Sequence, residues 1–219
     1  MDKDWCKYTG NKVLLVEGQN DCHVILALCQ AYNIPETFGI YECGSDTGAL
    51  KRLNALISGA DAPSVIGIVL DADSPDLEER WKSVQGKLKN YDYSLPIAPD
   101  LTGTIVKSPS DYPGLGFWLM PNNRDPGMLE DFCMEMIDTD MIATVEQCLQ
   151  IAEASGHTSF KSVHRSKAIV HTYLAWQDEP GLRLGQAITA RVLRSNTQPA
   201  KVFAEWLTLL FRENNHNVA

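Results

Sequence analysis

Short apolar runs divide the first half of the chain, and two of them consist largely of β-branched and aliphatic residues. These runs occupy positions 13–16 and 65–70, and their composition is typical of strands buried on both faces of a sheet. Each run ends abruptly in acidic residues. Three other runs, at 37–43, 103–106 and 115–120, predict further strands.

Between these runs, apolar residues recur three and four positions apart, which indicates amphipathic helices. In the first half of the chain this spacing predicts helices over 20–32, 46–57 and 76–90. Strands that alternate with helices of this length form parallel sheets with right-handed crossover connections. We therefore expect an α/β fold in this half.

The second half of the chain has a helical pattern. It follows a turn-rich segment at 121–127. Apolar residues at helical spacing then predict helices over 128–137, 141–154, 166–176 and 199–211. We expect a mostly parallel sheet flanked by helices over residues 1–137, followed by a helical C-terminal part over residues 138–219 that packs on it.

The composition is ordinary for a globular protein, with 44% hydrophobic and 21% charged residues. No apolar stretch is long enough to span a bilayer, and the N-terminus lacks the pattern of a signal peptide. We therefore expect a cytoplasmic protein that has no membrane partner. Trp81, Trp118, Trp176 and Trp206 all fall at inward-facing positions, so we expect them in the core.

The six cysteines are scattered along the chain, without a C-x-x-C pair or a cluster with histidine. Most of them lie in apolar surroundings, where a free thiol behaves as a small hydrophobic side chain. The spacing argues against structural zinc and against a disulfide framework. We expect reduced, buried thiols.

The formal net charge of the chain is −9. A protein that binds nucleic acid through its phosphates usually presents a basic face. The charge argues against tight, sequence-independent binding over the whole surface, so any basic face must be local. Basic residues do gather in the second half, between positions 161 and 201.

Three acidic residues follow the two best-defined strands: Glu17 after the first, and Asp71 and Asp73 after the run at 65–70. Ligands bind at the carboxyl ends of strands in open parallel sheets, and residues two apart on an extended chain point to the same side. Clustered carboxylates raise one another's pKa unless a cation neutralises them, and their oxygens suit Mg²⁺ or Mn²⁺. The pattern predicts a divalent-metal site, and each acid taken alone has the alternative role of a helix cap.

Two later residues are candidates that also have plainer explanations. Glu130 lies in the first turn of a predicted helix, where the helix dipole favours an acid in any case. Lys167 lies near the start of another helix, where a cation opposes the dipole, which hints at a functional placement. Lys167 could neutralise the charge that develops on a phosphate, and a solvated surface lysine is the alternative.

The segment from Val16 to Asp21, VEGQND, followed by a strand that ends in Asp71-x-Asp73, resembles the Toprim domain. That superfamily includes topoisomerases, primases, small ribonucleases and OLD-type nucleases. The resemblance implies a compact Toprim-like α/β domain in the first part of the chain. It also implies that Glu17, Asp71 and Asp73 hold Mg²⁺ for phosphodiester chemistry.

The same resemblance gives roles to two further acids. Asp21, one helical turn beyond Glu17, matches the second acid that many nuclease-type members carry. Glu130 would bind a second ion, as in OLD-type nucleases. Two ions about 3.5–4 Å apart can stabilise both the attacking and the leaving oxygen of an in-line displacement.

A narrower resemblance, to a family of small Toprim-related proteins called DUF3226, covers most of the chain. The residues that carry it lie at 116–123, 127–131 and 167–177. This narrower family implies no settled activity, so the functional expectation comes from the Toprim part.

Hydrolysis of nucleic acid is the simplest use of such a site, with Glu17, Asp71, Asp73 and Lys167 as the catalytic residues. One alternative is a non-catalytic Toprim-like module that binds a nucleotide or a partner protein. A separate ATPase is a possible partner, because OLD-type nucleases usually carry one. A second alternative is a phosphatase of the haloacid dehalogenase type, but Pro75 stands where that family has Thr or Val.

Overall fold

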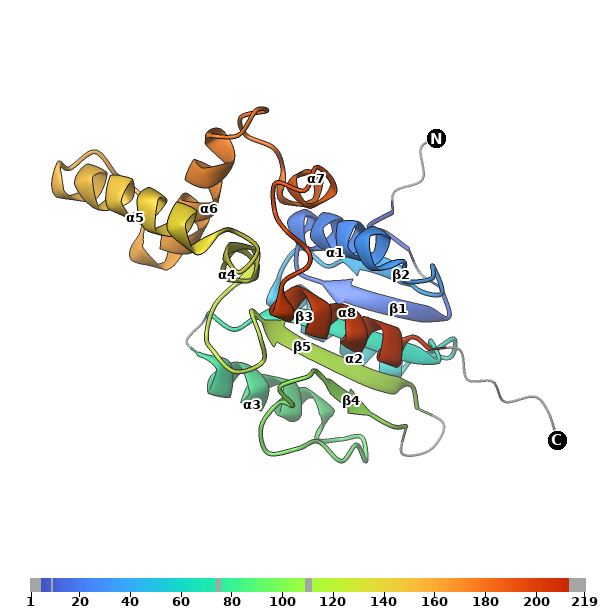
Figure 1. Ribbon diagram of the computed structural model, residues 1–219. Coiled ribbons are helices and arrows are strands. Elements are labelled where there is room, and N and C mark those ends of the chain that lie inside the picture. The colour runs from blue at the N-terminus through green and yellow to red at the C-terminus, as the bar shows by residue number, and fades with distance from the viewer. Residues whose placement is uncertain (1–4, 9, 74–75, 109–111, 213–219) are drawn as a thin grey trace.

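The computed structural model describes residues 5–8, 10–73, 76–108 and 112–212, and in these a five-stranded sheet has helices on both faces (Figure 1). The strands are β1 (Lys12–Val16), β2 (Gly39–Glu42), β3 (Val65–Asp71), β4 (Thr104–Val106) and β5 (Gly114–Met120). Their order in the sheet is β2-β1-β3-β5-β4. All neighbours are parallel except β4, which pairs with β5 in the antiparallel sense. The mostly parallel α/β fold expected from the sequence is confirmed.

Helices α2 (Asp46–Ile57) and α3 (Leu77–Leu88) cover one face of the sheet. Successive strand residues point to opposite faces, so every second apolar residue of a strand faces these two helices. Leu15, Ile68 and Phe117 are examples, and all three are almost completely buried. This alternation explains why the strands are continuously apolar: each face has its own core.

Helices α1 (Gln19–Tyr32) and α8 (Gln198–Leu210) belong to the core on the other face, together with strand residues such as Leu14, Val69 and Trp118. Figure 1 shows α8, the last helix, lying in front of the sheet and close to its middle strands. The C-terminal end of the chain therefore returns to the sheet that the N-terminal half builds.

Helices α4, α5 and α6 lie beyond the carboxyl ends of the strands, and α5 and α6 extend away from the sheet (Figure 1). Helix α7 packs against α1, and α6 packs against both α4 and α5. A short 3₁₀ turn, Ser162–His164, precedes α6. The bounds of these helices are α4 (Leu129–Met134), α5 (Thr139–Ala154), α6 (Arg165–Ala175) and α7 (Leu184–Thr189). Of these four helices, α7 is the one that the sequence pattern did not predict.

The expectation of reduced thiols is wrong for one pair, because Cys6 and Cys22 form a disulfide. Residues 6–8 run beside β2, where Glu42 N donates to Cys6 O at 2.8 Å. That pairing brings Cys6 to the first turns of α1, a contact between distant parts of the sequence that cysteine spacing does not reveal. The other cysteines are free, and Cys148 is exposed.

The expectation that all four tryptophans are buried is wrong for Trp176, which is 45% exposed. Trp176 is the residue that follows the last residue of α6, so the helical periodicity that would turn it inward has already ended. Trp81, Trp118 and Trp206 are buried as expected.

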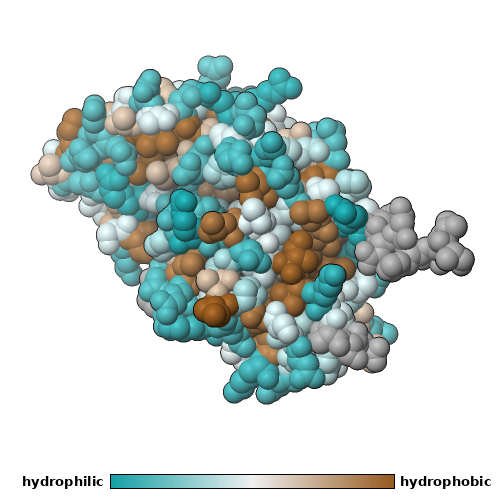
Figure 2. Space-filling view, turned by 60° about the horizontal axis from the view of Figure 1, so that its bottom comes forward, coloured by the Kyte–Doolittle hydropathy of each residue, from teal (hydrophilic) through white to brown (hydrophobic). Residues whose placement is uncertain are grey.

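Apolar side chains also reach the surface of the protein. Figure 2 shows them as several separate brown areas among hydrophilic residues. The most exposed large ones include Ile97 and Leu209. Scattered apolar residues are normal on protein surfaces and do not mark a binding site by themselves. No helix among the described residues has both the length and the apolar character needed to cross a bilayer.

A glycine of β5 permits the close approach of α8. A Cβ atom at Gly116 would lie 2.4–3.0 Å from side-chain carbons of Leu210, a distance at which something must move. Leu210 is itself buried, so it has little room to move away. By contrast, a Cβ atom at Gly86 on α3 would meet nothing within 4 Å.

We expect Gly116→Ala to lower the free energy of unfolding by about 1–3 kcal/mol, because the new methyl group overpacks the contact between β5 and α8. Gly86→Ala is the matched control, and its added helix propensity should raise stability by up to about 1 kcal/mol. Urea unfolding of both variants measures the difference. Equal stability of the two variants would contradict the packing argument.

Candidate active site

A pocket of about 350 Å³ opens at the carboxyl ends of the central strands. Its walls come from the loop after β1, the loop after β2, the end of β3 and the starts of α4 and α6. Five of the six residues predicted from the sequence line it: Glu17, Asp21, Asp71, Glu130 and Lys167. Asp73 is not among the lining residues. Segments that lie up to 150 residues apart in the sequence (17 against 167) thus meet in one place.

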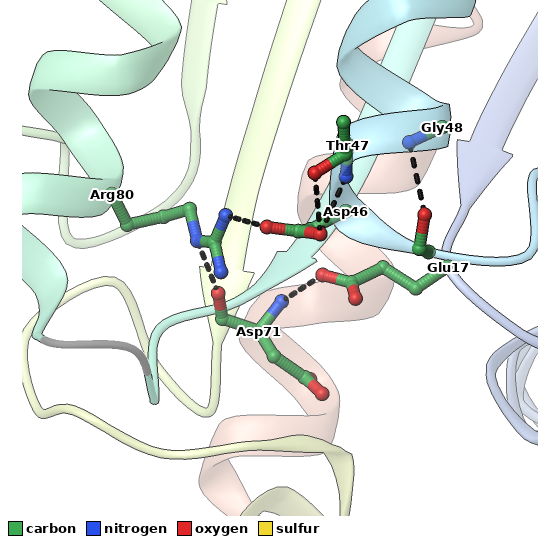
Figure 3. Close-up of polar contacts among 7 residues, drawn as sticks. Glu17, Asp46, Thr47, Gly48, Asp71 and Arg80 are labelled. Atoms are coloured by element: carbon green, nitrogen blue, oxygen red, sulfur yellow. Dashed lines mark hydrogen bonds and ion pairs between the residues drawn. The ribbon is translucent and has the colours of Figure 1, made fainter.

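Glu17 and Asp71 are neighbours because β1 and β3 are adjacent parallel strands that end at the same level. The backbone N–H of Asp71 donates to Glu17 Oε1 at 2.8 Å (Figure 3). The side chain of Asp71 points the other way along the pocket, and its Oδ1 accepts a hydrogen bond from Leu129 N at 3.0 Å. Asp71 therefore connects the end of β3 to both β1 and the start of α4.

Asp21 is buried in the first turn of α1. Its Oδ2 accepts a hydrogen bond from the backbone N–H of Gly18 at 3.1 Å, so it acts as a cap residue as well as lining the pocket. The capping alternative does not hold for Asp71 or Asp73 at α3, because Asp76 caps that helix through Glu79 N.

The two acids in the first turn of α4 have different partners. Asp131 accepts hydrogen bonds from Met128 N at 2.8 Å and from the hydroxyl of Ser166, and so it ties α4 to the start of α6. Glu130 is buried and faces the pocket, where its Oε1 lies 3.2 Å from Lys167 Nζ. The Lys167 side chain is 47% exposed. The Asp131–Ser166 contact joins α4 to the turn that carries Lys167, and the half-exposed lysine lies at the wall of the pocket.

Burial and mutual repulsion raise the pKa values of three of the carboxyl groups. Burial is the main cause at Asp71, and the charges of Asp21, Glu17 and further acids add to it, raising its pKa to about 9. Burial likewise raises the pKa of Glu17 to about 7 and that of Asp21 to about 6. Near neutral pH the metal-free pocket therefore holds protons that a bound cation would displace.

The donor chemistry of the pocket fits a hard divalent cation, because Glu17, Asp21, Asp71 and Glu130 all line it and carry carboxylate oxygens. Within the described part of the chain, no three Asp, Glu, His or Cys side chains already stand as a group that could hold a metal ion. The carboxylates already have other partners: three of them accept hydrogen bonds from backbone N–H groups, and Glu130 pairs with Lys167. Binding a metal therefore requires some of these side chains to change conformation.

Two residues that the sequence analysis missed support the end of β3. Arg80, which is 7% exposed, donates from Nε to Asp71 O at 2.8 Å, and its Nη1 pairs with Asp46 Oδ2 (Figure 3). Arg80 joins α3, the start of α2 and the strand that carries Asp71. The sequence does contain a sign of this role, because Arg80 lies four residues before Val84 and eight before Leu88, on the inward face of α3. A charged residue at such a position needs a partner.

The fold and the pocket define an α/β protein with a carboxylate-rich site at the carboxyl ends of parallel strands. A protein-family model, described as "Protein of unknown function (DUF3226)", matches residues 11–212, so the chain belongs to this family. No curated protein matches the chain.

A solved structure that resembles this one is the C-terminal region of the Burkholderia pseudomallei OLD protein. The two share 14% sequence identity, with 90% of this chain and 88% of that chain covered and a TM-score of 0.37. At this level of similarity, nothing about the activity of the present chain follows from the likeness.

The raised pKa values make a prediction about stability and pH. Folded-state pKa values above about 4, the value in an unfolded chain, mean that the folded protein holds these protons more tightly. The contribution of these protons to the free energy of unfolding is fully present below about pH 4 and is lost as the pH rises to about 9. In EDTA, Asp71→Asn should therefore gain stability over the wild type as the pH rises from 5 to 9, because it removes the ionising group and keeps an acceptor for Leu129 N.

Chemical unfolding at pH 5, 7 and 9 measures this gain. Asp125→Asn is the control, because Arg124 holds the pKa of exposed Asp125 below its ordinary value and its contribution is constant over this range. If the difference in stability between Asp71→Asn and the wild type is the same at all three pH values, the carboxyl groups of the pocket do not repel one another.

Proposed function

We propose that this protein hydrolyses phosphodiester bonds of nucleic acid with the help of Mg²⁺ or Mn²⁺. The observation that carries the proposal is the meeting of four carboxylates and one lysine in a single pocket at the carboxyl ends of parallel strands. Buried acids with raised pKa values are costly to keep together, and a cation bound among them removes that cost. The likeness of the VEGQND and Asp71-x-Asp73 segments to the Toprim domain supports the same chemistry.

Glu17, Asp71 and Glu130 are the residues that would hold the cation, with Asp21 beside them in the pocket. Asp73 stays a predicted ligand, two residues beyond Asp71. A divalent ion supplies polarisation of the phosphate and a more acidic water. Release of the Glu130 carboxylate from Lys167 frees the ammonium group at the pocket wall. Lys167 can then offset the negative charge that develops on the phosphate oxygens.

The second candidate function is a non-catalytic module that binds a nucleotide or a partner protein. The observation in its favour is the net charge of −9, which argues against tight binding of a phosphate backbone over the whole surface. A separate ATPase as the partner stays a prediction for either function.

A phosphatase of the haloacid dehalogenase type has less support. That family has Thr or Val two positions beyond its second aspartate, where Pro75 stands in this sequence. It would also leave the convergence of Glu17, Asp21 and Glu130 without a role.

Cleavage of labelled single- and double-stranded DNA and RNA tests the proposal. We expect cleavage with Mg²⁺ or Mn²⁺ and none in EDTA, and a loss of rate of about 10²-fold or more in Glu17→Gln, Asp71→Asn and Lys167→Met. Lys201→Met, which removes an exposed lysine outside the pocket, should keep the wild-type rate.

Each variant is first shown to be folded by circular dichroism. Folded wild-type protein that cleaves none of the four substrates with either ion would contradict the hydrolase and favour the binding module. Cleavage that persists in Asp71→Asn and Glu17→Gln would place the activity elsewhere.

A further inference from the structure

A second groove, of about 420 Å³, lies beside the candidate active site, between β2 and α2. The two hollows meet at Gly44, which lines both. A Cβ atom at Gly44 would have nothing within 4 Å, and the residue has a φ of +83°, a left-handed conformation that suits glycine. The junction therefore has no side chain in the way, and a bound chain can pass from one hollow to the other.

The groove carries more positive than negative charge, although the whole chain is acidic. Its charged lining residues are the cations Lys7, Lys51 and Arg52 and the single carboxylate Glu42. Lys7 pairs with Glu42 at 2.8 Å. Among the described residues, neither Lys51 nor Arg52 has a carboxylate within ion-pair distance, so their charges are not neutralised within the groove.

The guanidinium group of Arg52 is held in place rather than freely solvated. Its Cζ lies 3.6 Å from the centre of the Tyr41 ring, a stacked cation–π arrangement. Its Nε is buried and has no hydrogen-bond partner among the described residues. The buried Nε is out of reach of a ligand, so the Nη groups at the tip of the stacked guanidinium are the donors that suit phosphate.

We propose that this groove binds the phosphate backbone of single-stranded nucleic acid and leads the strand past Gly44 into the candidate active site. The inference rests on the proposed function, because hydrolysis of phosphodiester bonds in the adjoining pocket requires a nucleic-acid strand rather than an acidic peptide. A single strand fits better than a duplex. Double-stranded DNA is stiff over about 150 base pairs, whereas a flexible single strand can follow both hollows past Gly44.

Fluorescence anisotropy of labelled 15-nucleotide single strands of DNA and RNA tests the groove without any cleavage. Binding is measured over a series of salt concentrations, in EDTA and again with Ca²⁺. The variant is Lys51→Gln with Arg52→Gln. The control is Lys87→Gln with Lys201→Gln, which makes the same change of net charge at exposed lysines that line neither hollow.

We expect wild type and control to bind the single strands more tightly than a duplex of the same length. The groove variant should bind at least about 10-fold more weakly. The slope of log K against log salt should fall by about 1.4, because each lost phosphate contact on a single strand is worth about 0.7. The single change Lys51→Gln, at an exposed position, should show about half of the slope change and guards against misfolding of the double variant.

Equal weakening in the groove variant and the control, or wild-type protein that binds no single strand in either condition, would overturn the inference. Tighter binding of an acidic peptide than of the strands would overturn it as well. Metal-dependent cleavage together with unchanged binding in the groove variant would contradict the groove and leave the proposed function standing. Binding that is weakened in the groove variant, in a protein that shows no cleavage, would support the groove and contradict the proposed function.

Discussion

The end of β3 is the point on which the rest of the site depends, because the backbone and side chain of Asp71 are bonded to three other elements. Its N–H donates to Glu17 after β1, its carbonyl accepts from Arg80 of α3, and its carboxylate accepts from Leu129 at the start of α4. These bonds hold an acidic residue in a buried position beside other acids. The geometry of the strands thus enforces a crowding of charge that the carboxylates themselves oppose.

Such crowding is unfavourable for a metal-free protein, and carboxyl groups with strongly raised pKa values cluster at functional sites. Here the elements around it supply compensating contacts: Asp131 with Ser166 joins α4 to α6, and Glu130 pairs with Lys167. These contacts bring a lysine from the C-terminal helical part to the sheet of the N-terminal half. The candidate site therefore needs both halves of the chain, and α8 returns to the same core.

The sequence predicted the sheet well, because continuous apolar runs and helical spacing are local signals. It also predicted that Glu17 and Asp71 would meet, since parallel strands end at one edge. The helix dipole favours both Glu130 and Asp131, so the choice of Glu130 came from the Toprim resemblance alone, and the different contacts of the two acids with α6 depend on packing. The Cys6–Cys22 disulfide and the Arg80 contacts likewise depend on segments that are distant in sequence, and no local pattern encodes such contacts.

Calorimetric titration of the metal-free protein with Mn²⁺ is the measurement that decides whether the carboxylate pocket is a divalent-cation site. We expect saturable binding to the wild type, with release of protons that is seen as a dependence of the binding heat on the ionisation heat of the buffer at pH 7–8. We expect binding to be lost in the double variant Glu17→Gln/Asp71→Asn. Folded wild-type protein that binds no Mn²⁺, or a double variant that binds it equally well, would show that the pocket is not a cation site.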